Sequence, residues 1–179
     1  MFTRSLLAVV MVGLATSALA AETPMLGKPI SPADLAPWDI SIAPDGAGLP
    51  PGKGTAKQGK QIFFEKCSYC HGEGGQGTPA DRLVGGQGTL TSDTPIKTIG
   101  SYWPYATTLF DFIRRAMPLN EPQSLTNEEV YALSAYLLAA NDIVPMNTTL
   151  NAKSLPKVKM PNKGNFFIVY PRNDVAAGP

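Results

Sequence analysis

Apolar residues recur at helical spacing in a stretch that begins near Thr55. Thr55 and Gln58 form a T-x-x-Q capping box, in which each side chain can bond the backbone N–H of the other residue. The positions that then follow at helical spacing are Gly59, Ile62, Phe63 and Lys66. The pattern predicts a first helix that runs from Thr55 up to Cys67.

Two later segments show the same period. From about 108 to 116 the apolar residues share one face, and Pro118 limits the end because the residue before a proline avoids the helical backbone conformation. Thr126 and Glu129 form another capping box, which opens a third helix lasting to about Ala140. The two faces consist of Leu109, Phe110 and Ile113, and of Val130, Leu133, Ser134, Leu137 and Leu138. Since no strand-rich region or internal repeat stands out, we predict an all-α fold.

The segments on either side of these helices differ in composition. Residues 21–54 contain seven prolines and no sustained helical period, which predicts an extended arm on the surface. Residues 142–179 also carry prolines, and their basic residues exceed their acidic residues by three. We therefore expect four parts: a signal peptide at 1–20, the arm at 21–54, a helical domain at 55–141 and an extended basic tail at 142–179.

The first twenty residues have the pattern of a secretory signal peptide. Arg4 gives a positive start, residues 5–15 form an apolar run, and Ala18-Leu19-Ala20 is a small-x-small cleavage site. The run is too short for a spanning helix, and no later segment approaches the roughly 18 uninterrupted apolar residues that one needs. We expect cleavage after Ala20 and export of a protein without a membrane span.

The informative chemistry is local. Without the signal peptide the chain has 14 basic and 14 acidic residues, so no overall field marks a nucleic-acid-binding protein. The two cysteines and the one histidine of the chain lie together as Cys67, Cys70 and His71. In C-x-x-C-H each thiol can add to one vinyl group of a haem, and the histidine then lies under the iron as its proximal ligand. We expect one covalently attached haem c, because no second C-x-x-C-H occurs.

Two other uses of these residues lack their usual setting. A thioredoxin-type redox pair belongs to a β-α-β unit, and a structural zinc site needs four ligands where Cys67, Cys70 and His71 supply three. The glycines within 72–77 match G-x-G-x-x-G, but that dinucleotide-binding fingerprint follows a strand and opens a helix. We expect a flexible loop at the haem edge instead.

The sixth position of the iron decides between an electron carrier and a catalyst. The chain has no second histidine, so methionine is the natural ligand. Met117 stands where Pro118 stops the second helix, which frees its thioether to lie across the haem face. The alternative for Met117 is a gap-filling role in the core, and we expect Met25, Met146 and Met160 in packing or at the surface.

The propionates of a haem need polar partners. The sequence "GSYWPY" offers Tyr102, Trp103 and Tyr105, whose O–H and N–H groups can donate hydrogen bonds. We keep Trp103 as a candidate for haem binding, with simple packing as an equal alternative, and expect the two tyrosines to pack.

The order of these features resembles a class I cytochrome c: a C-x-x-C-H helix, a glycine-rich loop, a helix ending in Met-Pro and a final amphipathic helix. The resemblance covers about residues 55–141. It implies a class I cytochrome c fold around one covalently bound haem, with the arm and tail as extensions. It also implies a close crossing of the first and last helices, at positions matched here by Gly59, Phe63, Leu133 and Tyr136. A glycine suits such a crossing because a missing side chain lets another helix approach.

Several strings resemble, more narrowly, the cytochrome c subunits of periplasmic sulfane and sulfite dehydrogenases of sulfur-oxidising bacteria. These strings are "DRLVGGQGTL", "KTIGSYWPYATTLFDFIRRAMP", "PQSLTNEEVYALSAYLL" and, in the arm, "WDISIAPDGAGLPPG". In that family the cytochrome accepts electrons from a molybdenum-cofactor subunit and passes them to other c-type cytochromes, so the resemblance implies the same partners and a periplasmic location. Some members carry two haems and this chain one, which leaves open whether it is a tight subunit or a free carrier.

The sequence is therefore compatible with three functions. The first is an electron-transfer subunit of a molybdenum-containing dehydrogenase, and the second is a general carrier to a terminal oxidase or other respiratory complex. The third is an enzyme, a haem peroxidase or a thiosulfate-oxidising cytochrome, which requires an open or cysteine-ligated iron, and no cysteine is left for that. The arm and tail favour the first, because they look suited to lying along a partner, although they could instead wrap the chain's own surface.

Overall fold

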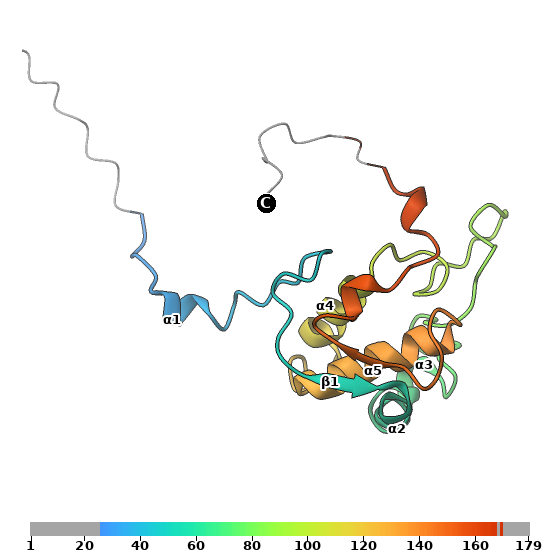
Figure 1. Cartoon of the computed structure of the whole chain (residues 1–179), viewed down its shortest axis with the longest axis horizontal. Coiled ribbons are helices and arrows are strands. Elements are labelled where there is room, and N and C mark those ends of the chain that lie inside the picture. Colours follow the sequence, from blue (N-terminus) through green and yellow to red (C-terminus); the bar gives the residue numbers. More distant parts are fainter. Residues whose placement is uncertain (1–25, 168, 170–179) are drawn as a thin grey trace, which may run out of the picture.

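The computed structural model describes residues 26–167 and 169, so the predicted signal peptide and Met25 lie outside the described residues. Figure 1 shows the longer helices gathered in one body, with the segment that carries α1 standing apart. None of the helices in this described part is long and apolar enough to cross a membrane. The elements in chain order are α1 (Pro32–Leu35), β1 (Lys53–Thr55), α2 (Ala56–Lys66), α3 (Ser68–His71), α4 (Ala106–Ala116), α5 (Asn127–Ala140), β2 (Thr149–Asn151) and the 3-10 helices η1 (Leu155–Lys157) and η2 (Lys163–Asn165).

Helices α2 and α5 each begin at a capping box, and both predicted boxes are confirmed. The Thr55 hydroxyl accepts from the N–H of Gln58 at 3.2 Å, and Oε1 of Gln58 accepts from the N–H of Thr55 at 3.0 Å. Thr126 and Glu129 make the same two bonds at the start of α5. Each box satisfies two N–H groups that a helix start leaves without a partner inside the helix.

Helix α4 begins at Ala106, two residues before the predicted start, and ends at Ala116 as predicted. The residue before it, Tyr105, makes no side-chain capping bond, so the sequence carries no start signal there. At the other end Met117 is extended, with φ −121° and ψ 144°, as expected for the residue before Pro118.

Helices α2 and α5 cross where α2 has no side chain. A methyl group on Gly59 would overlap the carbonyl oxygen of Ala132 and lie 2.8 Å from Cβ of Tyr136. Beside this point the rings of Phe63 and Tyr136 have their centroids 5.2 Å apart, and Leu133 is 1% exposed. The crossing implied by the resemblance is therefore confirmed.

Helix α5 is buried along ten consecutive residues, from Val130 to Ala139, and not only along the predicted stripe. The added cover comes from a short antiparallel ribbon of β1 and β2, in which Gly54 pairs with Leu150. A methyl group on Gly54 would overlap the backbone of Ala132, so β1 lies directly against α5. The sequence gives no signal for this ribbon, because three-residue strands are too short to show an alternation of apolar and polar residues.

The first part of the tail packs on the helices. The side chains of Leu155 and Met160 are 0% and 5% exposed and belong to the hydrophobic core. Nδ2 of Asn162 donates to the carbonyl of Tyr102 at 2.8 Å, and the rings of Tyr102 and Phe166 have their centroids 5.4 Å apart. The alternative in which the tail wraps the chain's own surface therefore holds for this part.

Candidate haem-attachment site

One helical turn carries the residues of C-x-x-C-H. Cys67 ends α2, where its N–H donates to the carbonyl of Phe63 at 2.9 Å, and it also precedes α3. The N–H groups of Cys70 and His71 donate to the carbonyl of Cys67 at 3.1 and 3.0 Å. Gly72 ends α3 with φ 79° and ψ 155°, a conformation that only glycine adopts readily. The turn therefore brings two thiols and an imidazole to one place.

The loop after α3 folds back and holds the ring of His71. Nδ1 of His71 lies 2.8 Å from the carbonyl oxygen of Asp81. Because a carbonyl oxygen can only accept, this contact requires a proton on Nδ1, and in the neutral ring it therefore leaves Nε2 as the nitrogen that can ligate a metal. The N–H of Gly77 donates to the carbonyl of His71 and that of Ala80 to the carbonyl of Cys70, both at 2.8 Å. These bonds keep the Asp81 carbonyl beside the ring.

The two thiols are not joined to each other. Cys67 is half-buried and Cys70 is exposed. Burial raises the pKa of the Cys67 thiol to about 11, although the positive charge of Lys66 acts to lower it. This thiol is therefore protonated near neutral pH. A redox-active pair needs a lowered pKa, which removes support for the thioredoxin alternative.

The zinc alternative gains no support either. Among residues 26–167 no three or more His, Cys, Asp or Glu side chains are arranged to hold a metal ion. The glycine-rich sequence follows helix α3 and not a strand, and no helix opens at its end. A dinucleotide-binding role therefore lacks its structural setting.

Met117 and Trp103 border the same hydrophobic core as Cys67. Met117 is half-buried at the end of α4, and its N–H donates to the carbonyl of Ile113 at 3.0 Å. The ring of Trp103 packs edge-on to Phe112, with centroids 5.8 Å apart and planes at 77°. Both side chains are thus partly free of the core and available for contacts with a bound group.

The other methionines have different surroundings. Met160 is buried in the core between η1 and η2. Met146 is 46% exposed in the turn before β2. These positions agree with the expected packing and surface roles.

Two cavities lie away from the candidate residues. One, of about 840 Å³, is bordered by β1, β2, α2 and the start of α5. The other, of about 270 Å³, lies between residues 87–101 and 161–165. Neither is lined by any of the five candidate haem-binding residues, so the chemistry of the donor set defines the site.

That donor set fits a covalently bound haem. It offers two unpaired thiols three positions apart, an imidazole whose Nε2 is free, and a thioether placed beyond the end of a helix. These are the groups that attach haem c and complete the coordination of its iron.

Two residues outside the predicted set also shape the site. Asp81 acts through its backbone carbonyl, which has no residue-type signature. Asn141 is 3% exposed, and its Nδ2 donates to the carbonyls of Leu83 and Leu137 at 3.1 and 2.9 Å. Its Oδ1 accepts from the N–H of Gly85 at 3.0 Å, which ties the loop to α5. An asparagine just past a helix end was the available signal.

The cytochrome c family model matches residues 56–141, from the first residue of α2 to the residue after α5. A curated relative, the thiosulfate dehydrogenase of Psychrobacter arcticus, is 28% identical over 101 residues. The matched part is 54% of this chain and 31% of the relative. The chain thus spans about a third of the length of that relative.

A solved structure is similar over more of the chain. In the crystal structure of the sulfane dehydrogenase SoxCD from Paracoccus pantotrophus, one chain is 34% identical with a TM-score of 0.76. The similarity covers 88% of this chain and 84% of that chain. Because it extends over most of both chains and the family match spans the helices around the C-x-x-C-H turn, the chain belongs to the cytochrome c family, as a class I cytochrome c, a family that carries covalently bound haem c.

Proposed function

We propose that the protein is a periplasmic cytochrome c with one haem, which accepts electrons from a molybdenum-containing sulfite or sulfane dehydrogenase subunit and passes them to other c-type cytochromes. The observation that carries this proposal is the 34% identity to a chain of the sulfane dehydrogenase SoxCD over 88% of this chain. That similarity extends well beyond residues 56–141, the part matched by the cytochrome c family as a whole.

Cys67 and Cys70 are the proposed attachment points. Each thiol would hold the haem by adding its S–H across one vinyl group, with a new sulfur–carbon bond and the hydrogen on the neighbouring carbon. The addition needs no oxidant, because no electrons leave the thiol or the vinyl group. The half-buried Cys67 and the exposed Cys70 lie on the same turn, which suits two such bonds to one porphyrin edge.

His71 and Met117 are the residues that would hold the iron of the haem. The haem supplies a one-electron iron couple. The Asp81 carbonyl holds Nδ1–H of His71, which fixes the ring and makes Nε2 a better donor. A methionine thioether raises the reduction potential relative to harder ligands. With His71 and Met117 both bound to the iron, the protein would exchange electrons without binding substrate there. Trp103 is the proposed hydrogen-bond donor to a propionate.

The test is donor-dependent haem reduction. Purified haem-loaded protein is mixed with a purified molybdenum-containing dehydrogenase subunit in a stopped-flow instrument, and sulfite or thiosulfate is added. We expect rapid reduction only when both the dehydrogenase subunit and its substrate are present. Reduction no faster than without the dehydrogenase would refute the proposal.

A general electron carrier is the second candidate, because the cytochrome c family match covers only the helical domain, which any such carrier has. A general carrier should exchange electrons with respiratory complexes, and the dehydrogenase subunit should not speed its reduction. The third candidate is an enzyme, which the similarity to a thiosulfate dehydrogenase suggests. Incubating the cytochrome alone with thiosulfate tests it. We expect no reduction in that control.

A further inference from the structure

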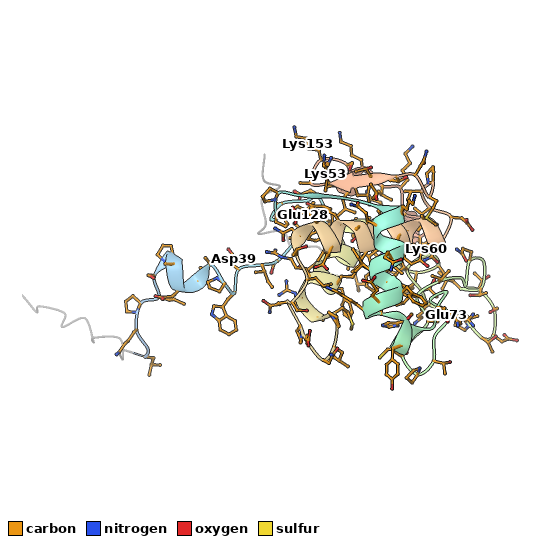
Figure 2. All side chains as sticks on the ribbon, turned by 90° about the horizontal axis from the view of Figure 1, so that it is seen from below. Asp39, Lys53, Lys60, Glu73, Glu128 and Lys153 are labelled. Atoms are coloured by element: carbon orange, nitrogen blue, oxygen red, sulfur yellow. The ribbon has the colours of Figure 1, made fainter. Side chains whose placement is uncertain are left out.

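Residues 26–40, here called the outer arm, carry large apolar side chains into solvent. Leu26 is 90% exposed, Ile30 60%, Leu35 46% and Trp38 79%. Figures 1 and 2 show this segment, with α1, standing away from the helical body. Aromatic side chains exposed in this way are typical of protein–protein contacts, in which tryptophan often supplies much of the affinity.

The outer arm has its own local order. The hydroxyl of Ser31 accepts from the N–H of Asp34 at 3.2 Å and so caps α1. The N–H groups of Trp38 and Asp39 both donate to the carbonyl of Leu35, at 2.9 and 3.0 Å. Three prolines further restrict the backbone. Because Trp38 already has a defined backbone, binding would cost little additional ordering.

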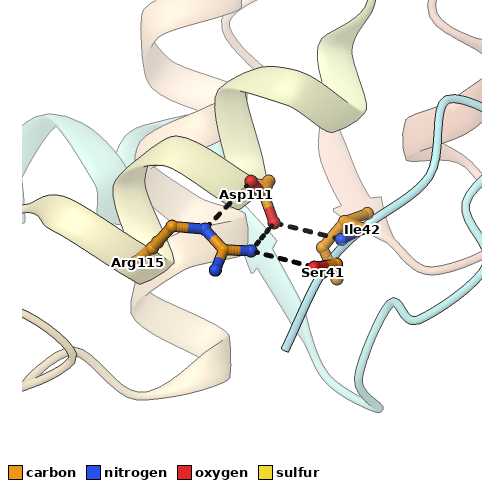
Figure 3. Close-up of polar contacts among 4 residues, drawn as sticks. All are labelled: Ser41, Ile42, Asp111 and Arg115. Carbon is orange, nitrogen blue, oxygen red and sulfur yellow. Dashed lines mark hydrogen bonds and ion pairs between the residues drawn. The ribbon is translucent and has the colours of Figure 1, made fainter. Parts of the chain in front are cut away.

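A polar clip joins the base of the outer arm to α4 (Figure 3). Oδ1 of Asp111 accepts from the N–H of Ile42 at 3.0 Å and from Nη2 of Arg115 at 2.8 Å. The same guanidinium nitrogen donates to the hydroxyl of Ser41 at 3.4 Å. The outer arm therefore leaves the body at a fixed place, beside the helix that leads to the proposed sixth haem ligand.

The outer arm does not suit a membrane surface. Helix α1 has four residues, and the charges of Lys28, Asp34 and Asp39 leave the segment net negative, whereas interfacial anchors are longer and basic.

The similarity to SoxCD indicates which kind of partner the outer arm binds. It covers 88% of the 179 residues, which is more than the 139 residues from Ser41 to the end of the chain, so it includes residues before Ser41. We propose, resting on the proposed function, that the outer arm inserts Leu35 and Trp38 into an apolar groove of the molybdenum-containing dehydrogenase subunit. This contact holds the cytochrome on its electron donor.

The experiment measures binding and electron transfer separately. The probe is the molybdenum-containing dehydrogenase subunit of the reduction test above, titrated against haem-loaded full-length protein by calorimetry and by stopped-flow reduction. Trp38→Ala should weaken the Kd about 30-fold, the loss typical of a buried tryptophan anchor. Reduction at saturating donor should stay unchanged, and so should the haem spectrum. The difference in Kd between the wild type and Trp38→Ala should change little as the salt concentration is raised, since the contact is apolar.

Matched controls distinguish the outcomes. Phe167→Ala removes a tail aromatic of similar exposure, 82%, and should bind like the wild type, while Trp38→Phe should retain most of the affinity. A Kd for Trp38→Ala within about 3-fold of wild type overturns the inference but leaves the proposed function intact. Loss of affinity in Phe167→Ala alone, or wild-type self-association that Trp38→Ala abolishes, also overturns it. If the dehydrogenase reduces neither protein, the proposed function fails and this inference with it.

Discussion

Replacing Gly59 by alanine should push α2 away from α5. The added methyl group would overlap the carbonyl oxygen of Ala132, and it would lie 2.8 Å from Cβ of Tyr136. Two carbon atoms in ordinary contact are about 3.5–4.0 Å apart, so the helices must separate by about 1 Å. The obstacle includes backbone, which cannot rotate out of the way as a long side chain could.

The cost follows from that displacement. A gap of about 0.5–1 Å forfeits a quarter to a half of the dispersion energy of each affected contact, and the Phe63–Tyr136 pair lies next to the crossing. Overpacked cores lose about 1–3 kcal/mol, and alanine returns up to about 1 kcal/mol through its better helix propensity. Since the clash with backbone favours the upper end, we expect a net loss of about 2 kcal/mol in the free energy of unfolding.

Thermal unfolding of the haem-loaded protein, followed by far-UV circular dichroism, measures this loss. For a unit of about 150 residues it corresponds to a decrease in Tm of about 4–8 °C. Gly164→Ala is the matched control, because a methyl group there meets no atom within 4 Å, and it should change stability by less than about 0.5 kcal/mol. A Gly59→Ala protein that melts together with this control would refute the close crossing.

Three further changes test the site and its surroundings. Replacing Cys67 and Cys70 together by alanine should let acid-acetone release the haem, and haem extracted from the wild type would contradict covalent attachment. Met117→Ala should abolish the weak sulfur-to-iron absorption band of the ferric protein and open the iron to carbon monoxide, whereas a surviving band would assign the ligand to another methionine. Glu129→Gln keeps the capping box but removes the 2.6 Å ion pair with Lys66. Burial raises the pKa of the Glu129 carboxyl, but hydrogen bonds from Lys66 and the helix N-cap outweigh it and hold the pKa below its ordinary value. The carboxylate therefore stabilises the fold above about pH 4.5 and loses this effect as the pH falls through the lowered pKa. The wild type should exceed the variant by about 0.2–1 kcal/mol at about pH 7, and this margin should shrink as the pH falls below about 4.5. A margin that does not change with pH would refute the assignment.

Features set by residues close in sequence could be predicted from the sequence. Both capping boxes span four positions, and the three C-x-x-C-H residues share one turn, so neither depends on the rest of the fold. Pro118 acts on its own neighbour, Met117, which the structure shows in the extended conformation. The start of α4 at Ala106 could not be predicted, because no side chain caps it.

Contacts between distant segments were decided only by the tertiary structure. The Asp81 carbonyl that orients His71, the β1–β2 ribbon that buries the far side of α5, and the bond from the N–H of Ile42 to Asp111 all use backbone groups. Every residue has a carbonyl and nearly every residue an N–H, so residue type does not mark which of them will pair. The partner is chosen by how the chain packs, and a carbonyl becomes the support of a haem ligand only because the folded loop brings it to within 2.8 Å of the imidazole.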